Sequence, residues 1–313
     1  MNEGSTSSEQ PSFHSPMPPA STAPGLGNII RNYLWLTKPI VIVLLLSTTL
    51  GAMLMAQRGL PSLMLIFFAM LGGALTAGGA SAINSYADRD IDPLMGRTSR
   101  RPIPTGAISA EHALIFGLVL SVSGVLIFGF FVNWLSAALS SIGLFYYVVI
   151  YTLWLKRTTP QNIVIGGAAG AIPPLVGWAA VTNEISLLAL FLFLIVFHWT
   201  PPHTWALMLM VTKDYQRAGV PMMPVAHGED STRLQIVLYT ISLLVVTILP
   251  FAFQLLGLGY LIAVTLLGAW LLYLSIKLWR DRSKATARLL YRHSNYYLAL
   301  VFLVAVLASI FGW

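Results

Sequence analysis

The chain has 313 residues, of which 57% are hydrophobic and only 9% are charged. A soluble protein carries about 25% charged residues, so the composition excludes a soluble globular enzyme and indicates a polytopic membrane protein. The absence of cysteine excludes disulfides and thiolate metal sites, and the net charge of +7 is more typical of membrane topology than of nucleic-acid binding.

The first 27 residues differ in composition from the rest of the chain. They are rich in Ser, Pro and Gly, contain no Lys or Arg, and cannot bury enough apolar surface to fold. They lack the basic start and apolar core of a signal peptide, and the Arg content of a transit peptide. We predict a disordered cytosolic tail over 1–27, followed by an intramembrane domain over 28–313.

Apolar segments of membrane-spanning length, about 20 residues each, follow along the domain. They predict an all-α polytopic protein with about nine transmembrane helices. Eight helices remain possible if the segment at 134–154 and its neighbour are misassigned. The predicted segments are 39–57, 62–84, 111–132, 134–154, 163–181, 186–209, 233–253, 257–279 and 294–312.

Lys and Arg are distributed unevenly among the loops between these segments. Seventeen of the 18 lie on the side of the N-terminus, and only Arg58 lies on the other side. The positive-inside rule therefore predicts a cytoplasmic N-terminus and a C-terminus on the opposite side. The opposite loops are short and nearly uncharged, so we expect the chemistry at the cytoplasmic mouth of a helical bundle.

The end of the second segment, NSYADRDID, carries three carboxylates within nine residues. On a helix, Asn84, Asp88 and Asp92 share one face, about 6 Å apart per step. Like charges at that distance repel by roughly 3 kcal/mol at an effective dielectric of about 20, and a divalent cation reverses this energy. Oxygen ligands suit Mg²⁺, which keeps its waters and bridges to phosphates. The motif thus predicts a magnesium–diphosphate site at a membrane surface.

The alternative for this motif is a solvated loop whose acids pair with Arg89 and Arg97. Asp90 lies off the shared face, and we expect it to pair with an arginine. The strict helical register of the other two acids favours the metal site over the solvated loop.

Cationic stretches elsewhere on the same side are candidates for phosphate contact, because guanidinium groups bind phosphate oxygens bidentately. Anchoring at the membrane interface is the alternative for each of them. Lys156 is the candidate for binding the leaving diphosphate. The candidate substrate-binding residues are Arg97, Arg100, Arg101, Tyr151, Arg157, His203, Lys213, Asp214 and Arg217.

Two proline pairs interrupt the apolar segments. We expect Pro201 and Pro202 to break the sixth span, since broken backbone at membrane depth is tolerated only beside a cavity or packed protein. Pro173 and Pro174 predict a kink in the fifth. His203 precedes Asp214 by eleven residues, so on one helix both would face the same way.

Four stretches, in this order, resemble the UbiA superfamily of intramembrane prenyltransferases, and within it the protoheme IX farnesyltransferase (haem O synthase) branch. The resemblance covers about 31–313 and rests on several matching motifs rather than one. The stretches are the acidic motif, RTSRRPIPTG at 97–106, LKRTTPQNIVIGG at 155–167, and WTPPHTWAL with KDYQRAGVPMMPV at 199–207 and 213–225.

The resemblance implies a bundle around a central cavity open near the cytoplasmic side. It implies transfer of a farnesyl group from farnesyl diphosphate to a vinyl group of protoheme IX (haem b, a substrate rather than a cofactor). The product is haem o, and a haem A synthase acts downstream. The resemblance also implies a bacterial inner-membrane location.

The resemblance implies residue roles as well. Mg²⁺ is expected at Asn84, Asp88 and Asp92, which together with Lys156 form the catalytic set, and Asp214 is a further candidate ligand. Most of the superfamily has a second Asp-rich motif after the sixth span, but here its first position is His203. With a histidine in place of the first aspartate, the second motif does not provide a complete metal site. The resemblance to the haem branch instead implies contact between His203 and the porphyrin or its iron.

Two other functions stay open. Kinked helices and membrane histidines also occur in secondary transporters, although transporters place charged residues near the midplane and this chain keeps its acids at one end of the spans. The other possibility is prenyl transfer to a quinone, a chlorin precursor or another tetrapyrrole.

Overall fold

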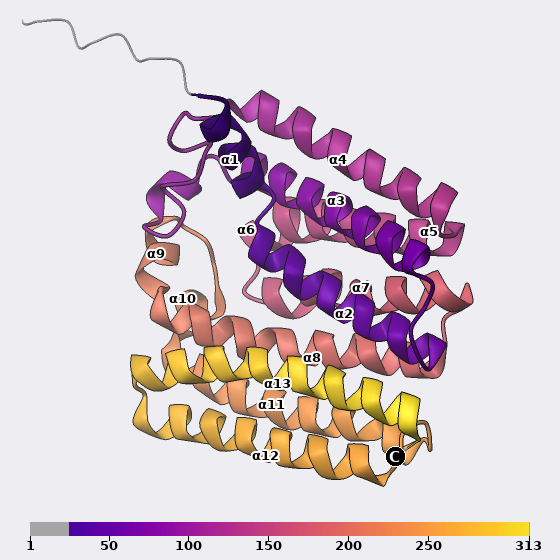
Figure 1. The fold of residues 1–313 in the computed structure, drawn as a ribbon. Coiled ribbons are helices and arrows are strands. Elements are labelled where there is room, and N and C mark those ends of the chain that lie inside the picture. The colour runs from indigo at the N-terminus through magenta and orange to yellow at the C-terminus, as the bar shows by residue number, and fades with distance from the viewer. Residues whose placement is uncertain (1–24, 313) are drawn as a thin grey trace, which may run out of the picture.

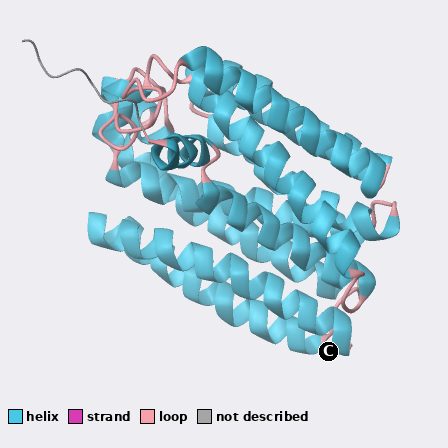
Figure 2. Cartoon of the chain, turned by 45° about the horizontal axis from the view of Figure 1, so that its top comes forward, coloured by secondary structure: helices cyan, strands magenta, loops and turns pink. Residues whose placement is uncertain are grey.

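A computed structural model describes residues 25–312, and these residues fold entirely into helices and loops (Figures 1 and 2). Nine helices in the described range are long and apolar enough to cross a membrane, which confirms the predicted fold class. They are α2 (Pro39–Gln57), α3 (Leu63–Ala87), α4 (Ala110–Phe131), Trp134–Thr158 (α5, η2 and α6 in succession), α7 (Asn162–Thr182), α8 (Leu187–Met210), α11 (Gly228–Ala252), α12 (Leu258–Asp281) and α13 (Lys284–Phe311).

The N-terminal tail predicted for 1–27 lies almost wholly outside the described residues. Its last residues do not match the prediction, because Leu26 already begins a short helix, α1 (Leu26–Leu36), that precedes the first span. Two later helices also begin earlier than predicted: α11 starts at Gly228 and α13 at Lys284. Both extensions carry polar and charged residues, so hydropathy alone places the starts too late.

Close backbone contact joins α3 to α4, and glycines make it possible. A Cβ atom added at Gly124 would lie 2.7 Å from the carbonyl oxygen of Gly72, and one added at Gly117 would lie 2.9 Å from that of Gly79. Small residues that let helix backbones approach are the usual basis of packing in membranes, where no hydrophobic force acts between helices. This packing fixes α3, whose end carries the acidic motif.

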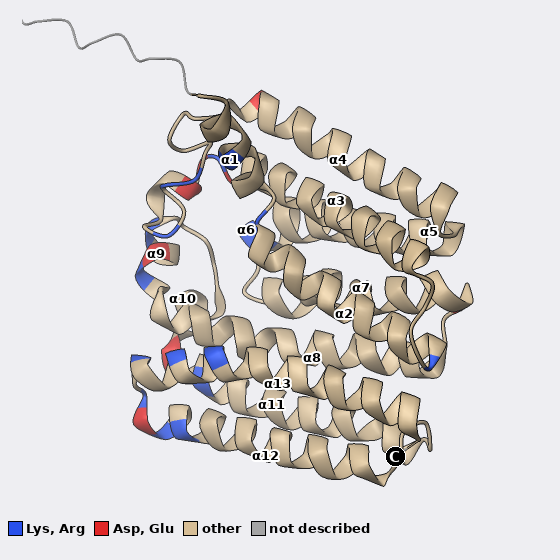
Figure 3. Ribbon diagram, viewed as in Figure 1, with Lys and Arg blue, Asp and Glu red and all other residues tan. Residues whose placement is uncertain are grey.

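Charged side chains gather at one end of the bundle, which we call the charged end (Figure 3). The short helices of the connecting loops lie there too: η1 (Asp92–Leu94), α9 (Thr212–Arg217) and α10 (Met223–Ala226). The loop containing Arg58, between α2 and α3, lies at the other end. The structure therefore keeps the charge separation expected from the sequence.

The prediction that Pro201 and Pro202 break the sixth span is wrong. Helix α8 continues through both prolines to Met210, and α7 likewise includes Pro173 and Pro174. Proline has a φ value that fits a helix, and neighbouring helices compensate the backbone bonds it removes in a membrane bundle. The helical path instead breaks at Val211 (φ −125°, ψ 25°), between α8 and α9.

The fourth span contains a feature that hydropathy does not reveal. Ten residues, Tyr146–Leu155 (η2), form a π-helix. The hydroxyl group of Thr152 donates a hydrogen bond to the carbonyl oxygen of Tyr147, five residues earlier, at 2.8 Å. π-Helical segments are rare and often occur at functional sites. Here the segment supplies side chains to both the acidic cluster and the cavity described below.

Candidate active site

The three residues of the acidic motif form a buried cluster at the charged end. Asn84, Asp88 and Asp92 are 4%, 1% and 2% exposed. Helix α3 ends at Ala87, yet the N–H of Asp88 donates to the Asn84 carbonyl at 2.9 Å and the N–H of Asp92 donates to the Asp88 carbonyl at 2.8 Å. Helical spacing thus continues through the turn, and the alternative of a solvated acidic loop does not apply.

Each member of this cluster has its own cationic partner. Lys156 Nζ lies 2.5 Å from Asp88 Oδ2, and Arg101 donates to both carboxylate oxygens of Asp92 at 2.8 and 3.0 Å. The third cation, Lys38, donates to Asn84 Oδ1 at 2.5 Å. Buried charge is tolerated only when it is paired and hydrogen-bonded, so this arrangement accounts for two carboxylates beside a hydrocarbon interior.

Lys38 is a site residue that the sequence analysis missed. It precedes Pro39 at the start of α2 and adopts a left-handed conformation (φ 55°, ψ 66°), which non-glycine residues rarely adopt unless tertiary contacts hold them there. Burial lowers the pKa of Lys38 to about 7, and the nearby Arg101 charge adds to the decrease. The only signal in the sequence is a cation directly before a proline that begins an apolar span.

The cluster suits a divalent cation bridged to a phosphate. Asp88 Oδ1 is buried and has no hydrogen-bond partner, which leaves one anionic oxygen free. Within residues 25–312, no three His, Cys, Asp or Glu side chains are grouped so as to hold a metal ion by themselves. Mg²⁺ suits this small number of protein ligands, because it typically takes one or two carboxylates and completes its coordination shell with waters and substrate phosphates.

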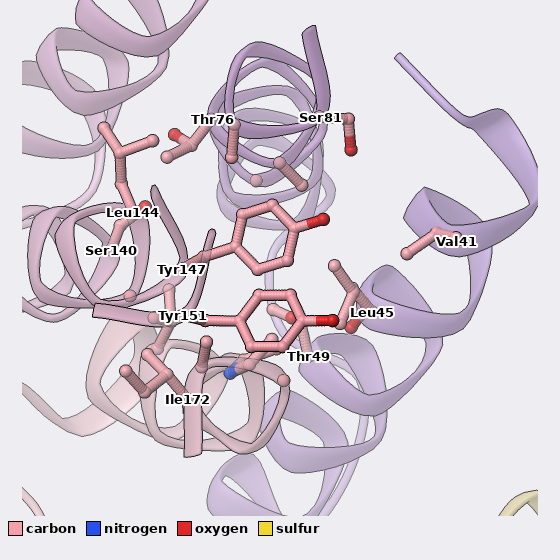
Figure 4. Close-up of a pocket in the computed structure, with 18 of the residues that line it drawn as sticks. Val41, Leu45, Thr49, Thr76, Ser81, Ser140, Leu144, Tyr147, Tyr151 and Ile172 are labelled. Atoms are coloured by element: carbon pink, nitrogen blue, oxygen red, sulfur yellow. The ribbon is translucent and has the colours of Figure 1, made fainter. Parts of the chain in front are cut away.

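An apolar cavity of about 370 Å³ begins one helical turn from this cluster. Ser81 lines the cavity and lies three residues before Asn84 on α3 (Figure 4). The other walls of the cavity come from α2, α4, α5, η2, α7 and α8. Tyr147 and Tyr151 stack inside it, with ring centroids 5.6 Å apart. Small-molecule pockets measure about 300–1,000 Å³, so the cavity suits a single apolar chain whose polar end reaches the cluster.

Tyr151, predicted to bind substrate, therefore lines the cavity, and Lys156 and Arg101 lie in the cluster. The side chains of Arg97, Arg100, Lys213 and Arg217 are exposed at the charged end, and no contact with the cluster is seen for them. Asp214 pairs with Arg217 at 3.4 Å and faces Gly96 in the loop after Asp92. The structure does not group Asp214 with Asp88 and Asp92.

Arg157 binds Asp90, which confirms the expectation that this acid pairs with an arginine. Two guanidinium nitrogens of Arg157 donate to the two carboxylate oxygens, each at 2.7 Å, and Nη2 also donates to the Ala87 carbonyl at 2.7 Å. Arg157 thus holds the turn that carries the acidic motif, rather than pointing into the cluster.

We expect Asp90→Asn to lower the thermal midpoint slightly at pH 7. The hydrogen bonds from Arg157 lower the pKa of Asp90 to about 2. A depressed pKa means that the pair stabilises the fold above the ordinary carboxyl pKa, near 4, and that this contribution is lost as the pH falls toward 2. The Asp90 side chain is 58% exposed, so the effect stays within about 1 kcal/mol. Thermal scans of both proteins at several pH values check it, and a difference that grows on acidification contradicts it.

His203 lies in an aromatic stack between α8 and α13. Its ring is 4.2 Å from that of Trp199 and 4.7 Å from that of Tyr291, centroid to centroid. His203 Nδ1 is 2.7 Å from Ser294 Oγ. Because α8 ends at Met210, the eleven-residue spacing does not place His203 and Asp214 on one helical face, and that expectation is wrong.

The chain matches the model of the UbiA prenyltransferase family over residues 45–311. Curated relatives named protoheme IX farnesyltransferase include one from Roseiflexus castenholzii, 54% identical over 90% of this chain and 53% of its own length. Another, from Gloeobacter violaceus, is 47% identical over 93% of this chain and 95% of its own length. The chain therefore spans about half the length of the first relative and nearly all of the second.

Solved structures share the fold at low sequence identity. A structure described as digeranylgeranylglyceryl phosphate synthase has a TM-score of 0.74 and 18% identity, covering 90% of this chain and 99% of its own. A UbiA homologue from Archaeoglobus fulgidus bound to DMAPP and Mg²⁺ has a TM-score of 0.65 and 15% identity, covering 90% and 100%. At these identities the likeness establishes the helical arrangement.

Proposed function

Because this chain belongs to the UbiA prenyltransferase family, an integral membrane family, we propose that it transfers a farnesyl group from farnesyl diphosphate to a vinyl group of protoheme IX. The observation that carries the proposal is the buried Asn84–Asp88–Asp92 cluster, with its cations, at the mouth of an apolar cavity. The choice of acceptor rests on the relatives named protoheme IX farnesyltransferase, one of which aligns over nearly its whole length.

The diphosphate is proposed to bind at the cluster. Asn84, Asp88 and Asp92 would hold Mg²⁺, which when bound offsets negative charge on the leaving group. Lys156 and Arg101 already lie at the carboxylates, within reach of phosphate oxygens that arrive there. Charge-assisted hydrogen bonds from these side chains then stabilise the charge that grows as the diphosphate departs.

The carbon chain is proposed to lie in the cavity, where ionisation generates an allylic cation. The C–O bond breaks and the diphosphate leaves with the electron pair. The stacked faces of Tyr147 and Tyr151 stabilise the cation through cation–π contact, and the apolar walls exclude water. The vinyl group attacks to form the new C–C bond. Water then adds to the carbon next to the macrocycle and loses a proton, which gives the hydroxyl group of haem o.

The remaining assignments follow the distribution of charge. By the positive-inside rule, the charged end is proposed to face the cytoplasm, with the N-terminus inside and the C-terminus outside. The membrane is proposed to be a bacterial inner membrane. By the same rule, the chain before α1 is proposed to lie on the cytoplasmic side. A haem A synthase is the proposed recipient of the product.

A competition assay tests the acceptor. Purified protein is incubated with labelled farnesyl diphosphate, Mg²⁺ and equal amounts of protoheme IX, a quinone precursor and a chlorin precursor. We expect the label in the haem fraction. Label in another acceptor would make the chain a different prenyltransferase, and counter-transport by proteoliposomes without any labelled product would favour the transporter alternative.

We further propose that His203 offers Nε2 to the haem iron. The hydroxyl of Ser294 donates to the Tyr291 carbonyl at 2.8 Å, so its oxygen accepts from Nδ1–H of His203. A hydrogen bond from Nδ1–H leaves the lone pair on Nε2, the tautomer that ligates metals.

His203→Ala is therefore expected to shift the Soret band of the haem complex and to weaken haem binding. His198→Ala is the matched control, because His198 lies on the same helix and bonds only the Leu194 carbonyl of its own turn. An unchanged Soret band in His203→Ala would count against ligation.

A further inference from the structure

The end of the cavity farthest from the acidic cluster is formed in part by Phe128, the residue that α4 contributes to the lining. We infer that Phe128 is an end wall that sets the length of the prenyl chain. The inference rests on the proposed function only in taking a prenyl diphosphate as the donor, and it does not depend on the acceptor.

The positions of the lining residues give the direction and depth of the cavity. On α3 they run from Ser81 to Gly73, eight residues or about 12 Å, and Gly73 is about 16 Å along the helix axis from Asn84. The fourth span runs in the same direction as α3, so the late residues of both lie at the charged end. Its Tyr151 adjoins Thr152, which accepts a hydrogen bond from Asn84, and its Ser140 lines the far end. A chain anchored at the cluster therefore points toward Phe128.

The Phe128 ring reaches the cavity across two adjacent glycines. A Cβ atom at Gly72 would lie 3.0 Å from Cδ2 of Phe128, and one at Gly73 would lie 3.9 Å from its Cζ. Phe128 is fully buried and packs in a core cluster with Met53 and Ala69. The ring is thus enclosed on its other sides and acts as a fixed wall rather than a mobile side chain.

The phenyl ring of Phe128 is similar in size to the isoprene unit by which successive prenyl donors differ in length. Phe128→Ala removes a phenyl group, which has about as many carbons as one isoprene unit, and so opens room for a geranylgeranyl chain. Gly73→Ala acts in the opposite direction. Its added methyl group would lie 2.9 Å from Cδ2 of Leu46, the end of a flexible side chain that can shift, and it narrows the same end of the cavity.

Binding of three non-ionising donors tests the inference. Geranyl, farnesyl and geranylgeranyl thiolodiphosphates are titrated calorimetrically into the full chain with Mg²⁺. We expect the affinity for the geranylgeranyl analogue relative to the farnesyl analogue to rise at least tenfold in Phe128→Ala and less in the milder Phe128→Leu. Gly73→Ala should shift preference toward the geranyl analogue. Phe130→Ala is the control, because that side chain is 70% exposed on the same helix.

Wild-type ranking retained in both Phe128→Ala and Phe128→Leu would overturn the inference while leaving prenyl transfer intact. If the wild-type chain binds none of the three analogues, the proposed function itself fails, which is a separate outcome.

Discussion

Asp88→Ala is expected to reduce formation of farnesylated haem by roughly 10³-fold, while the protein still inserts into the membrane. Asp88 is 1% exposed, and its Oδ2 accepts hydrogen bonds from Lys156 and Asn84. Its Oδ1 is the free buried oxygen at the site proposed for Mg²⁺ and diphosphate. The rate of transfer, measured in membranes and normalised to the amount of inserted protein, checks this expectation.

A stability effect must be separated from this loss of chemistry. Removing Asp88 leaves Lys156 buried without its partner, which costs about 3–5 kcal/mol. The double variant Asp88→Ala/Lys156→Met removes both charges, so it should recover much of the stability and none of the activity. Asp88→Asn keeps the shape of the side chain and should be nearly as inactive as Asp88→Ala. Near-normal haem o production by either single variant would remove Asp88 from the mechanism.

Lys156→Met is expected to lower kcat by about 10²–10³-fold, which corresponds to about 2.7–4 kcal/mol of transition-state stabilisation. Lys156 lies 2.5 Å from Asp88 and is largely buried, so its charge acts where the dielectric is low. The charge on the departing diphosphate is larger in the transition state than in the bound substrate. The loss should therefore appear in kcat more than in KM.

Single-turnover reactions with labelled farnesyl diphosphate measure this effect. Lys277→Met is the matched control, because Lys277 is an exposed lysine near the charged end of α12, outside the cluster. A Lys156→Met enzyme with an unchanged kcat and a raised KM would show that Lys156 only binds the ground state.

The nine spans and the acidic cluster could be predicted because their signals are local. Each span is a mostly apolar segment of membrane-spanning length, and the spacing of Asn84, Asp88 and Asp92 alone predicts that they share a helical face. The structure ends α3 at Ala87, but the hydrogen bonds of the following turn preserve that spacing. Lys156 could be proposed because it ends an apolar span on the same side as the acids.

The partners across helices could not be predicted, because they depend on which spans pack together. Lys38 and Asn84 are 46 residues apart, and their contact follows from the start of α2 lying beside the end of α3. The same limit applies to the Asp90–Arg157 pair, whose partner was not specified, and to the stack of His203 on α13. The π-helix at Tyr146–Leu155 carries no pattern that hydropathy detects.

Transfer by the purified chain tests the central claim most directly. The protein in lipid nanodiscs is mixed with protoheme IX and farnesyl diphosphate, with Mg²⁺ or with a chelator, and the haem is analysed by mass spectrometry. We predict that the haem gains a farnesyl group and a hydroxyl group when Mg²⁺ is present, and remains unmodified with the chelator. Unmodified haem at saturating Mg²⁺ and farnesyl diphosphate, or equal yields under both conditions, would contradict the account.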